Sequence, residues 1–317
     1  MDTLLAPGIW QIDTLLGGFE KVNATFLVEG DRPCLVETGP QRDAAQVLAA
    51  LARHQMGAQD LAWIVVSHIH LDHAGAVGEM AANFPRASVV CHPKGARHLA
   101  DPTRLIAASA EVYGERLDTL YGRMTPVPLD RLMAAEDGLV LELGAGRSLL
   151  LVHSPGHAKH HLGILEQSSG TLLVGDAVGV KLPGSGPLRP ATPPNDFDLE
   201  LAVHSLHRFR ELRPTQLVLT HFGPVGEPEA VLVEAEDALQ SWAAVASEAF
   251  AERPEVDHIE RALRARFASS AEPPGPTQTA QDILSGFRSN AEGMFGWLRR
   301  QRESRAQVEE GGATAPQ

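Results

Sequence analysis

Apolar and polar positions in the first third of the chain alternate between short strand-like runs and helix-like stretches. Strands are predicted, each bounded by turn-forming residues, over 8–14, 24–29, 33–38, 61–68 and 88–93. The run 61–68 is almost continuously apolar, which is typical of a strand buried on both faces. Helical spacing of apolar residues follows Asp43 and returns over 74–83. This alternation predicts a mixed sheet flanked by helices.

The middle of the chain loses the strand pattern and then regains it. Apolar residues at helix-like spacing predict a helical insertion over about 101–137. A proline-rich stretch over 180–195 predicts an extended loop, and a helix is expected near 197–211. Further strands are predicted over 138–143, 148–153, 161–166, 171–176 and 216–221.

The last part of the chain has a purely helical pattern. After Pro228 an apolar stripe marks one helix face, a second helix is expected over about 255–268, and a third follows the proline-rich break at 273–276. We therefore divide the chain into a core over 1–227 and a C-terminal helical region over 228–301. Residues 302–317 are polar and rich in glycine and alanine, so we expect a disordered, frayed tail.

Composition narrows the class of protein. The 317 residues are 44% hydrophobic and 21% charged, which fits a globular protein with a sizeable core. The net charge of −13 disfavours binding to nucleic acid. The chain shows neither a signal-peptide pattern nor an apolar run of the ~18–20 residues that a membrane span needs, so we expect a cytoplasmic protein without a membrane partner. Cys34 and Cys91 form no CxxC motif and are expected to be buried apolar residues.

Four metal-competent side chains cluster where the apolar strand 61–68 ends. They are His68, His70, Asp72 and His73, within the sequence SHIHLDHAGA. His68 and His70 are two residues apart, so an extended backbone projects both to one side. As packing residues, each of the four would need its own buried partner. A shared metal ion explains all of them and is the prediction we make.

Further candidate ligands follow other predicted strands. The segment HSPGHAKHHLG contains His153, His157, His160 and His161, while Asp176 and His221 each come directly after an apolar run. Polar residues beyond strand ends meet at one edge in α/β proteins, and function concentrates there.

These motifs, in this order, resemble the metallo-β-lactamase fold superfamily of metallohydrolases. The resemblance rests on HxHxDH at 68–73, ProGlyHis at 155–157, GlyAsp at 175–176 and the late His221, and it covers residues 8 to about 225. It is highly specific for the fold and weakly specific for the substrate. It implies a four-layer αβ/βα sandwich with a two-metal site at one edge.

The resemblance also implies a role for each residue. Seven side chains would hold two divalent ions: His68, His70 and His157 one ion, Asp72, His73 and His221 the other, with Asp176 bridging them. Imidazole and carboxylate ligands suit zinc, with iron and manganese as alternatives. A hydroxide bridging the two ions would attack an electrophilic carbonyl or phosphorus atom. Asp72 would act as a catalytic residue that orients the hydroxide and passes its proton to the leaving group.

Expectations also follow for other polar residues. His161 lies four residues after His157, where family members carry a second histidine near the substrate, and we expect a catalytic role. His160 is left open between a site and a surface position. Glu37 stands where the family has an aspartate that supports the site, so the longer side chain is expected to alter that support. Structural or solvated positions are expected for His92, His98 and His153.

Hydrolysis of an ester, thioester or lactone is the leading interpretation of the reaction. Apolar residues of the insertion either wall the metal cleft for an acyl substrate or form a plain helix core: Leu105, Ile106, Tyr113, Leu117, Tyr121 and Met124. Glyoxalase II and the acyl-homoserine lactonases are the nearest functional analogues. The C-terminal region has no lysine, unlike the basic cluster with which glyoxalase II grips glutathione, and this favours a lactonase or general esterase.

Alternative reactions stay open. A persulfide dioxygenase of this fold would use one iron on two histidines and Asp176, although such enzymes tend to leave empty the second site that Asp72, His73 and His221 would complete here. A small-molecule phosphodiesterase is also compatible with the motif. A non-catalytic module is disfavoured because the ligand set is intact. We expect a small-molecule substrate and leave homo-oligomerisation open.

Overall fold

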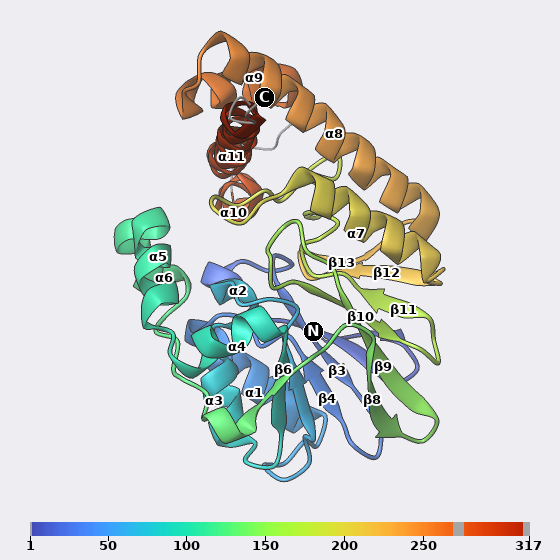
Figure 1. Cartoon of the computed structure of the whole chain (residues 1–317). Helices are drawn as coiled ribbons and strands as arrows, with labels where there is room; N and C mark the ends of the chain where they lie inside the picture. Colours follow the sequence, from blue (N-terminus) through green and yellow to red (C-terminus); the bar gives the residue numbers. More distant parts are fainter. Residues whose placement is uncertain (1, 269–275, 313–317) are drawn as a thin grey trace.

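Two β-sheets stacked face to face form the centre of the molecule (Figure 1). The structure is a computed structural model and describes residues 2–268 and 276–312. The first sheet has the strand order β1-β2-β3-β4-β5-β6-β7, with bounds Thr3–Ala6, Ile9–Asp13, Ala24–Val28, Cys34–Val36, Trp63–Val65, Ser88–Cys91 and Leu132–Ala134. The second has the order β13-β12-β11-β10-β9-β8, with bounds, from β8 to β13, Leu139–Gly144, Arg147–His153, Leu162–Glu166, Thr171–Leu173, Gln216–Leu219 and Gly223–Val225.

Helices cover the outer faces of both sheets. The first sheet carries α1 (Ala44–Arg53) and α3 (Val77–Asn83), and the second carries α7 (Leu199–Glu211) and α8 (Pro228–Glu252) (Figure 1). This arrangement is the expected αβ/βα sandwich, so the predicted fold class is confirmed.

Apolar side chains on both faces of the central strands explain the layering. On β3, Phe26 and Val28 belong to the cluster between the sheets, whereas Leu27 packs with Val47 and Leu51 of α1. Successive residues of a strand point to opposite faces, so one continuous apolar run serves two core layers. A third buried cluster joins the second sheet to α7, α8 and the later helices.

The insertion is shorter than the sequence pattern indicated. It contains α5 (Thr103–Tyr113), a 3-10 turn (Gly114–Arg116), α6 (Leu117–Leu120) and a second 3-10 turn (Leu129–Arg131). Within the predicted range, β7 pairs in parallel with β6 and belongs to the first sheet. This strand has three residues, none of them fully buried, and it follows a stretch with helix-like apolar spacing, so the sequence pattern missed it.

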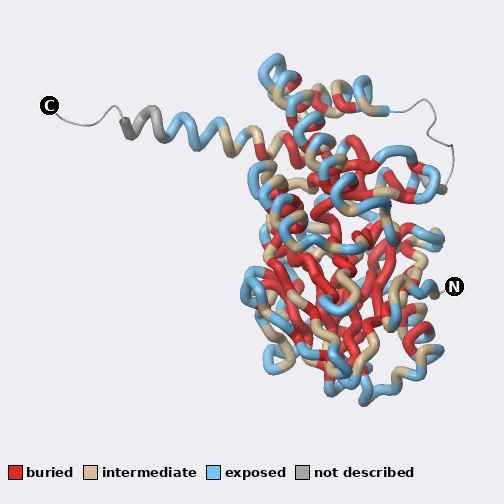
Figure 2. Tube along the Cα trace, turned by 90° about the vertical axis from the view of Figure 1, so that its right-hand side faces the viewer, coloured by how far each residue is buried: buried red, intermediate tan, exposed pale blue. Residues whose placement is uncertain are grey.

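The C-terminal region comprises α8, α9 (Val256–Phe267), α10 (Pro276–Ser285) and α11 (Phe287–Gly312), so the expected third helix is two helices separated at Gly286. The tail expected to be frayed continues α11 as far as Gly312 and projects from the body (Figure 2), while residues 313–317 lie outside the described residues. Among the described helices, none combines the length and the apolar character that a membrane crossing requires.

Candidate metal centre

Three imidazoles converge beside the end of β5. The Nε2 atom of His68 lies 2.9 Å from Nδ1 of His70, and Nε2 of His157 lies 3.1 Å from the same atom. The other ring nitrogens of two of them are held, because Nδ1 of His68 lies 2.9 Å from the Ser67 hydroxyl and Nδ1 of His157 donates to the Ala191 carbonyl at 2.9 Å. Three ring nitrogens therefore face one point, as the ligands of a single ion do.

A second donor group lies next to the first. The Nε2 atoms of His73 and His221 are 3.3 Å apart, and Oδ2 of Asp72 lies 3.7 Å and 3.4 Å from them. Nδ1 of His221 donates a hydrogen bond to the Val22 carbonyl at 2.9 Å. The lone pair of Nε2 is therefore free to bind a metal ion. His73 and Asp72 lie on the short helix α2 (Leu71–Ala74), whereas His221 follows β12 of the other sheet.

Asp176 lies between the two groups. Its Oδ1 atom is 3.4 Å from Nε2 of His73 and 3.3 Å from Nε2 of His221, and its Oδ2 atom is 3.6 Å from Nε2 of His157. Oδ1 is buried and accepts no hydrogen bond within the described part of the chain. A buried carboxylate oxygen without a partner is costly, and a cation shared by the two groups would satisfy it.

A glycine makes this placement of Asp176 feasible. Gly175 has a φ angle of +51°, and a Cβ atom there would lie 2.5 Å from Nε2 of His161 and 2.8 Å from Oγ of Ser67. Only glycine avoids both the left-handed strain and this overlap. In the GlyAsp motif, the aspartate therefore serves as the candidate ligand and the glycine is required for steric reasons.

The electrostatics of the buried cluster fit a divalent cation. Burial alone would lower the pKa of His73, but the carboxylates of Asp176, Asp72 and Glu37 outweigh it and hold that pKa well above its usual range. Burial, together with His157 and His160, lowers the pKa of His70 to about 3, so this imidazole is neutral and can donate its lone pair. Each of the groups His68–His70–His157 and Asp72–His73–His221 has its donor atoms within 4.8 Å of one another. The predicted ligands thus fit divalent metal ions.

Glu37 supports the second group directly. Its Oε1 atom lies 3.1 Å from Nδ1 of His73, and its Oε2 atom accepts a hydrogen bond from the Ser67 backbone at 3.2 Å. The residue has a φ angle of +63°, which is uncommon for a side chain other than glycine. The longer carboxylate therefore reaches the imidazole through an unusual backbone conformation.

His161 does not occupy the position expected of a catalytic residue. It is completely buried and does not line the cavity above the ligands. Its Nε2 atom accepts a hydrogen bond from the backbone N–H of Asp176 at 3.2 Å, so Nδ1 carries the proton and donates to Ser154 at 2.8 Å. His161 therefore positions Asp176 through its backbone, on the side away from the cavity. His160, left open by the sequence, does line the cavity and lies 3.4 Å from Oδ2 of Asp196.

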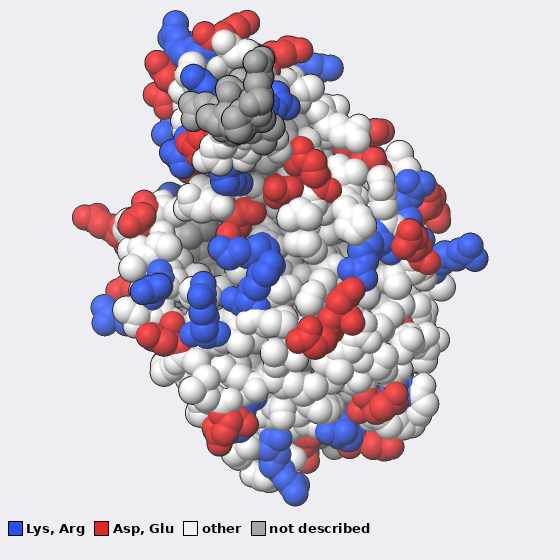
Figure 3. Space-filling view, viewed as in Figure 1, with Lys and Arg blue, Asp and Glu red and all other residues white. Residues whose placement is uncertain are grey.

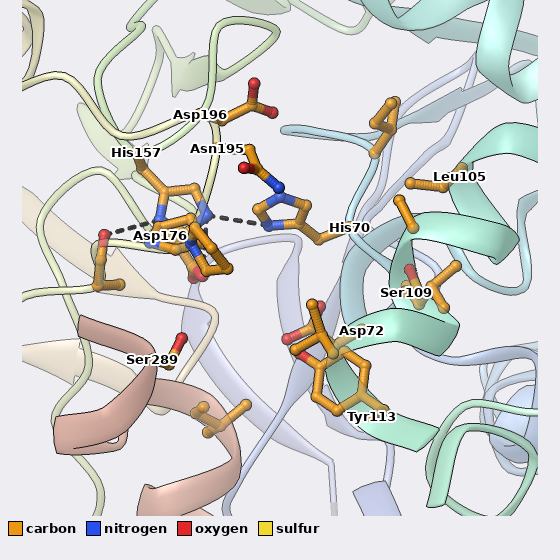
Figure 4. A pocket seen from close by; sticks show the side chains of 18 of the residues that line it. His70, Asp72, Leu105, Ser109, Tyr113, His157, Asp176, Asn195, Asp196 and Ser289 are labelled. Atoms are coloured by element: carbon orange, nitrogen blue, oxygen red, sulfur yellow. Dashed lines mark hydrogen bonds and ion pairs between the residues drawn. The ribbon is translucent and has the colours of Figure 1, made fainter. Parts of the chain in front are cut away.

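A cavity of about 300 Å³ opens above the ligands, between α5 on one side and α10 and α11 on the other (Figure 4). Its floor contains Asp72 and Asp176, and Ser289 of α11 faces it across from Ser109 of α5. The rest of the lining is partly apolar and includes Leu105, Val112, Tyr113, Tyr121, Ile283 and Leu284.

The cavity separates the two interpretations of the insertion. All six apolar residues that the sequence singled out there pack in or against the core cluster that contains α1 and α3, but only Leu105, Tyr113 and Tyr121 also line the cavity. The contribution of α10 and α11 was not predicted, because no spacing in the sequence links those helices to the histidine motifs.

Most of the residues expected to be structural do not line the cavity. His92 and His153 pack against each other with ring centroids 4.1 Å apart, and His153 donates to the Ala135 carbonyl at 2.8 Å. Cys34 and Cys91 are buried and unpaired, as predicted. His98, expected to be solvated or structural, lies at the mouth of the cavity.

Comparison with known proteins gives the family. Residues 17–221 match the family model of the metallo-beta-lactamase superfamily. The chain belongs to this superfamily. The metallo-beta-lactamase fold-containing protein ST1585 of Sulfurisphaera tokodaii is 30% identical over 168 residues, which are 52% of this chain and 62% of ST1585, so the match spans less than two thirds of that relative. A Bacillus subtilis protein named "Probable metallo-hydrolase YqjP" is 24% identical over 226 residues, 65% of this chain and 69% of YqjP.

Solved structures support the fold of this superfamily member over nearly its whole length. The crystal structure of ST1585 superposes with a TM-score of 0.68 at 22% identity, covering 92% of this chain and 98% of the other. The metallo-beta-lactamase family protein TTHA1429 from Thermus thermophilus gives 0.65 at 23% identity, covering 96% of each chain. The flavodiiron protein from Giardia intestinalis gives 0.53 at 14% identity, covering 77% of this chain and 60% of the other. The predicted family is confirmed, and its fold serves more than one chemistry.

Proposed function

We propose that this chain is a metal-dependent hydrolase that acts on an ester, thioester or lactone of a small molecule. The observation that carries the proposal is Asp176, whose two carboxylate oxygens face two separate and complete donor groups. This arrangement supports two ions rather than one as the proposed metal content. When bound, two divalent ions supply a water that ionises near neutral pH and polarise the carbonyl that it attacks.

Two residues of the cavity would orient the attacking water and the substrate. Asp72 lines the cavity floor, and although burial alone would raise its pKa, His73 and His221 lower that pKa to about 2. Its carboxylate is then ionised at neutral pH and can accept a hydrogen bond from the attacking water and so orient it. Tyr113 faces the same end of the cavity (Figure 4), and burial with the nearby Asp72 raises its pKa to about 12. Its phenol keeps a proton to donate to the substrate.

The cavity wall supports an acyl substrate. Leu105 and Val112 on α5 face Ile283 and Leu284 on α10 across the cavity, so an apolar segment of a substrate can lie between the two helices. Carboxylic esters, thioesters and lactones with an apolar acyl part suit this environment better than phosphate esters that lack an apolar group.

A substrate panel at defined metal loading tests the proposal. The protein is stripped with a chelator, reloaded with Zn²⁺, Mn²⁺ or Fe²⁺, and assayed on p-nitrophenyl esters, thioesters, lactones and bis(p-nitrophenyl) phosphate. We expect turnover of carbonyl substrates only after metal is restored. Turnover confined to the phosphodiester would contradict the proposed substrate class.

Removal of single ligands gives the matching genetic test. His70→Ala or Asp176→Ala is expected to lower kcat/KM by more than about 100-fold and to reduce bound metal, since loss of even a residue that supports a ligand costs about 10–100-fold. Circular dichroism should show the fold retained. His204→Ala, which removes an exposed imidazole from α7, is the control and should leave both quantities unchanged.

A further inference from the structure

Positive charge gathers at the mouth of the cavity, although the whole chain carries a net charge of −13. Arg104 and Lys159 line the mouth together with His98. Arg97 belongs to the same group, because its Nε donates to Nε2 of His98 at 3.1 Å. Figure 3 shows Lys and Arg side chains gathered beside the hollow in the middle of this face.

His98 lies among these cations and feels their charge. Burial lowers the pKa of His98, and the positive charges of Arg97, Lys159 and Arg104 lower it further. Three permanent cations therefore lie close enough to His98 to act on its charge, at the entrance to the site.

Two carboxylates lie nearby and offset only part of this charge. Oδ1 of Asp196 lies 2.9 Å from Nζ of Lys159, and its Oδ2 faces His160. Asp101 accepts hydrogen bonds from the backbone and the hydroxyl of Thr103. These hydrogen bonds and the nearby charge of Arg104 lower the pKa of the Asp101 carboxyl. Arg104 is exposed and, within residues 2–268 and 276–312, has no hydrogen-bonded carboxylate partner. Its guanidinium is free to bind a ligand.

The order of groups along the cavity defines a substrate. The donor atoms for the metals lie at the floor, the apolar residues Leu105, Ile283 and Leu284 form the walls, and Arg104 and Lys159 lie at the mouth. Resting on the proposed function, we infer that the substrate carries an anionic group, a carboxylate or a phosphate, joined to the scissile carbonyl by an apolar segment. Arg104, the cation lining the mouth without a carboxylate partner among the described residues, determines this specificity by binding the anionic group.

Three p-nitrophenyl esters of similar length test the inference on the metal-loaded protein: the neutral butyrate, the glutarate monoester with a free carboxylate, and the 4-phosphonobutyrate ester. The readout is the ratio of kcat/KM for a charged ester to that for the butyrate. We expect a ratio above about 10 at low ionic strength that falls as salt is added, because salt screens exposed charges. The larger of the two ratios identifies the anion as carboxylate or phosphate.

Variants at the mouth assign the effect to a residue. Arg104→Gln is expected to lower the charged-to-neutral ratio about 3–10-fold, and Arg104→Glu to lower it further, because a rim charge acts mainly on capture of the ligand. Arg86→Gln, which removes an exposed arginine outside the cavity lining, is the matched control and should leave the ratio unchanged.

The two possible failures are distinct. Turnover of the butyrate with no preference for either charged ester, or an Arg104→Glu ratio equal to that of the unsubstituted protein, overturns this inference and leaves the proposed function in place. Absence of turnover with all three esters at every metal loading overturns both.

Discussion

At the scale of single residues, the site depends on groups that hold each imidazole by its second nitrogen. Ser67 and the Ala191 carbonyl orient two histidines of the first donor group, while the Val22 carbonyl and Glu37 orient those of the second. A metal-binding imidazole needs such a partner to fix its tautomer and direction. The ligands could be predicted from the sequence because they form motifs, but backbone carbonyls and single serines carry no motif.

Glu37→Gln tests this support. Both oxygens of Glu37 face donors, Nδ1 of His73 and the backbone N–H of Ser67, so an amide must turn its own N–H₂ toward one of them. We expect the affinity of the second metal ion to fall about 10–100-fold. Competition with a chromophoric chelator measures this affinity.

Glu142→Gln provides the control, because it makes the same chemical change at an exposed position on β8. Equal metal affinity in the Glu37 and Glu142 variants would show that the carboxylate of Glu37 does not support the site.

At the scale of elements, long and regular patterns were predicted well. The apolar run 61–68 contains β5, and the strand ends at Val65, where the chain leaves the sheet to place His68 and His70. Three strands were missed: β7 and β13 have three residues each and no continuous buried run, and β1 is an edge strand with exposed and half-buried residues. The apolar stripe after Pro228 predicted a buried helix face, but the surface that covers such a face depends on tertiary packing, which no local pattern encodes.

The projecting end of α11 is expected to be dispensable. Residues 302–307 are exposed, and the helix leaves the body there (Figure 2), whereas Arg300 still bonds to the Phe197 carbonyl and Gln301 to Glu200. Deletion of 302–317 should leave kcat/KM and the melting temperature unchanged. Thermal unfolding followed by circular dichroism, with an ester assay, measures both.

Trp297→Ala is the counterpart within the packed part of α11. This side chain is buried and donates from Nε1 to Glu200, so its loss should lower the free energy of unfolding by about 3–5 kcal/mol. A large loss of activity on deleting 302–317 would show instead that the projecting end has a function.

At the scale of the whole molecule, the two sheets bring together ligands that are far apart in the sequence. His68 and Asp72 follow β5 of the first sheet, whereas His157, Asp176 and His221 follow strands of the second. The order of the motifs identified the family resemblance, and the resemblance predicted that these ligands lie together. The charged mouth was not predictable, because Arg104, Lys159 and Asp196 belong to separate loops and helices with no recurring spacing, and the net charge of the chain has the opposite sign.

Family membership alone leaves the chemistry open at this scale. Structures of similar fold include a subclass B3 metallo-beta-lactamase, with a TM-score of 0.51, and the flavodiiron protein, with 0.53. Their names describe two different kinds of protein, a lactamase and a flavodiiron protein. The metal content of this chain therefore discriminates between hydrolysis and oxidation.

The most direct measurement is a metal titration of the chelator-stripped protein, with bound metal counted by mass spectrometry while ester hydrolysis and oxygen consumption are recorded on the same samples. The account predicts two divalent ions per chain, with hydrolysis rising as the sites fill and no oxygen uptake. One tightly held iron per chain, with oxygen uptake and no hydrolysis, would contradict it.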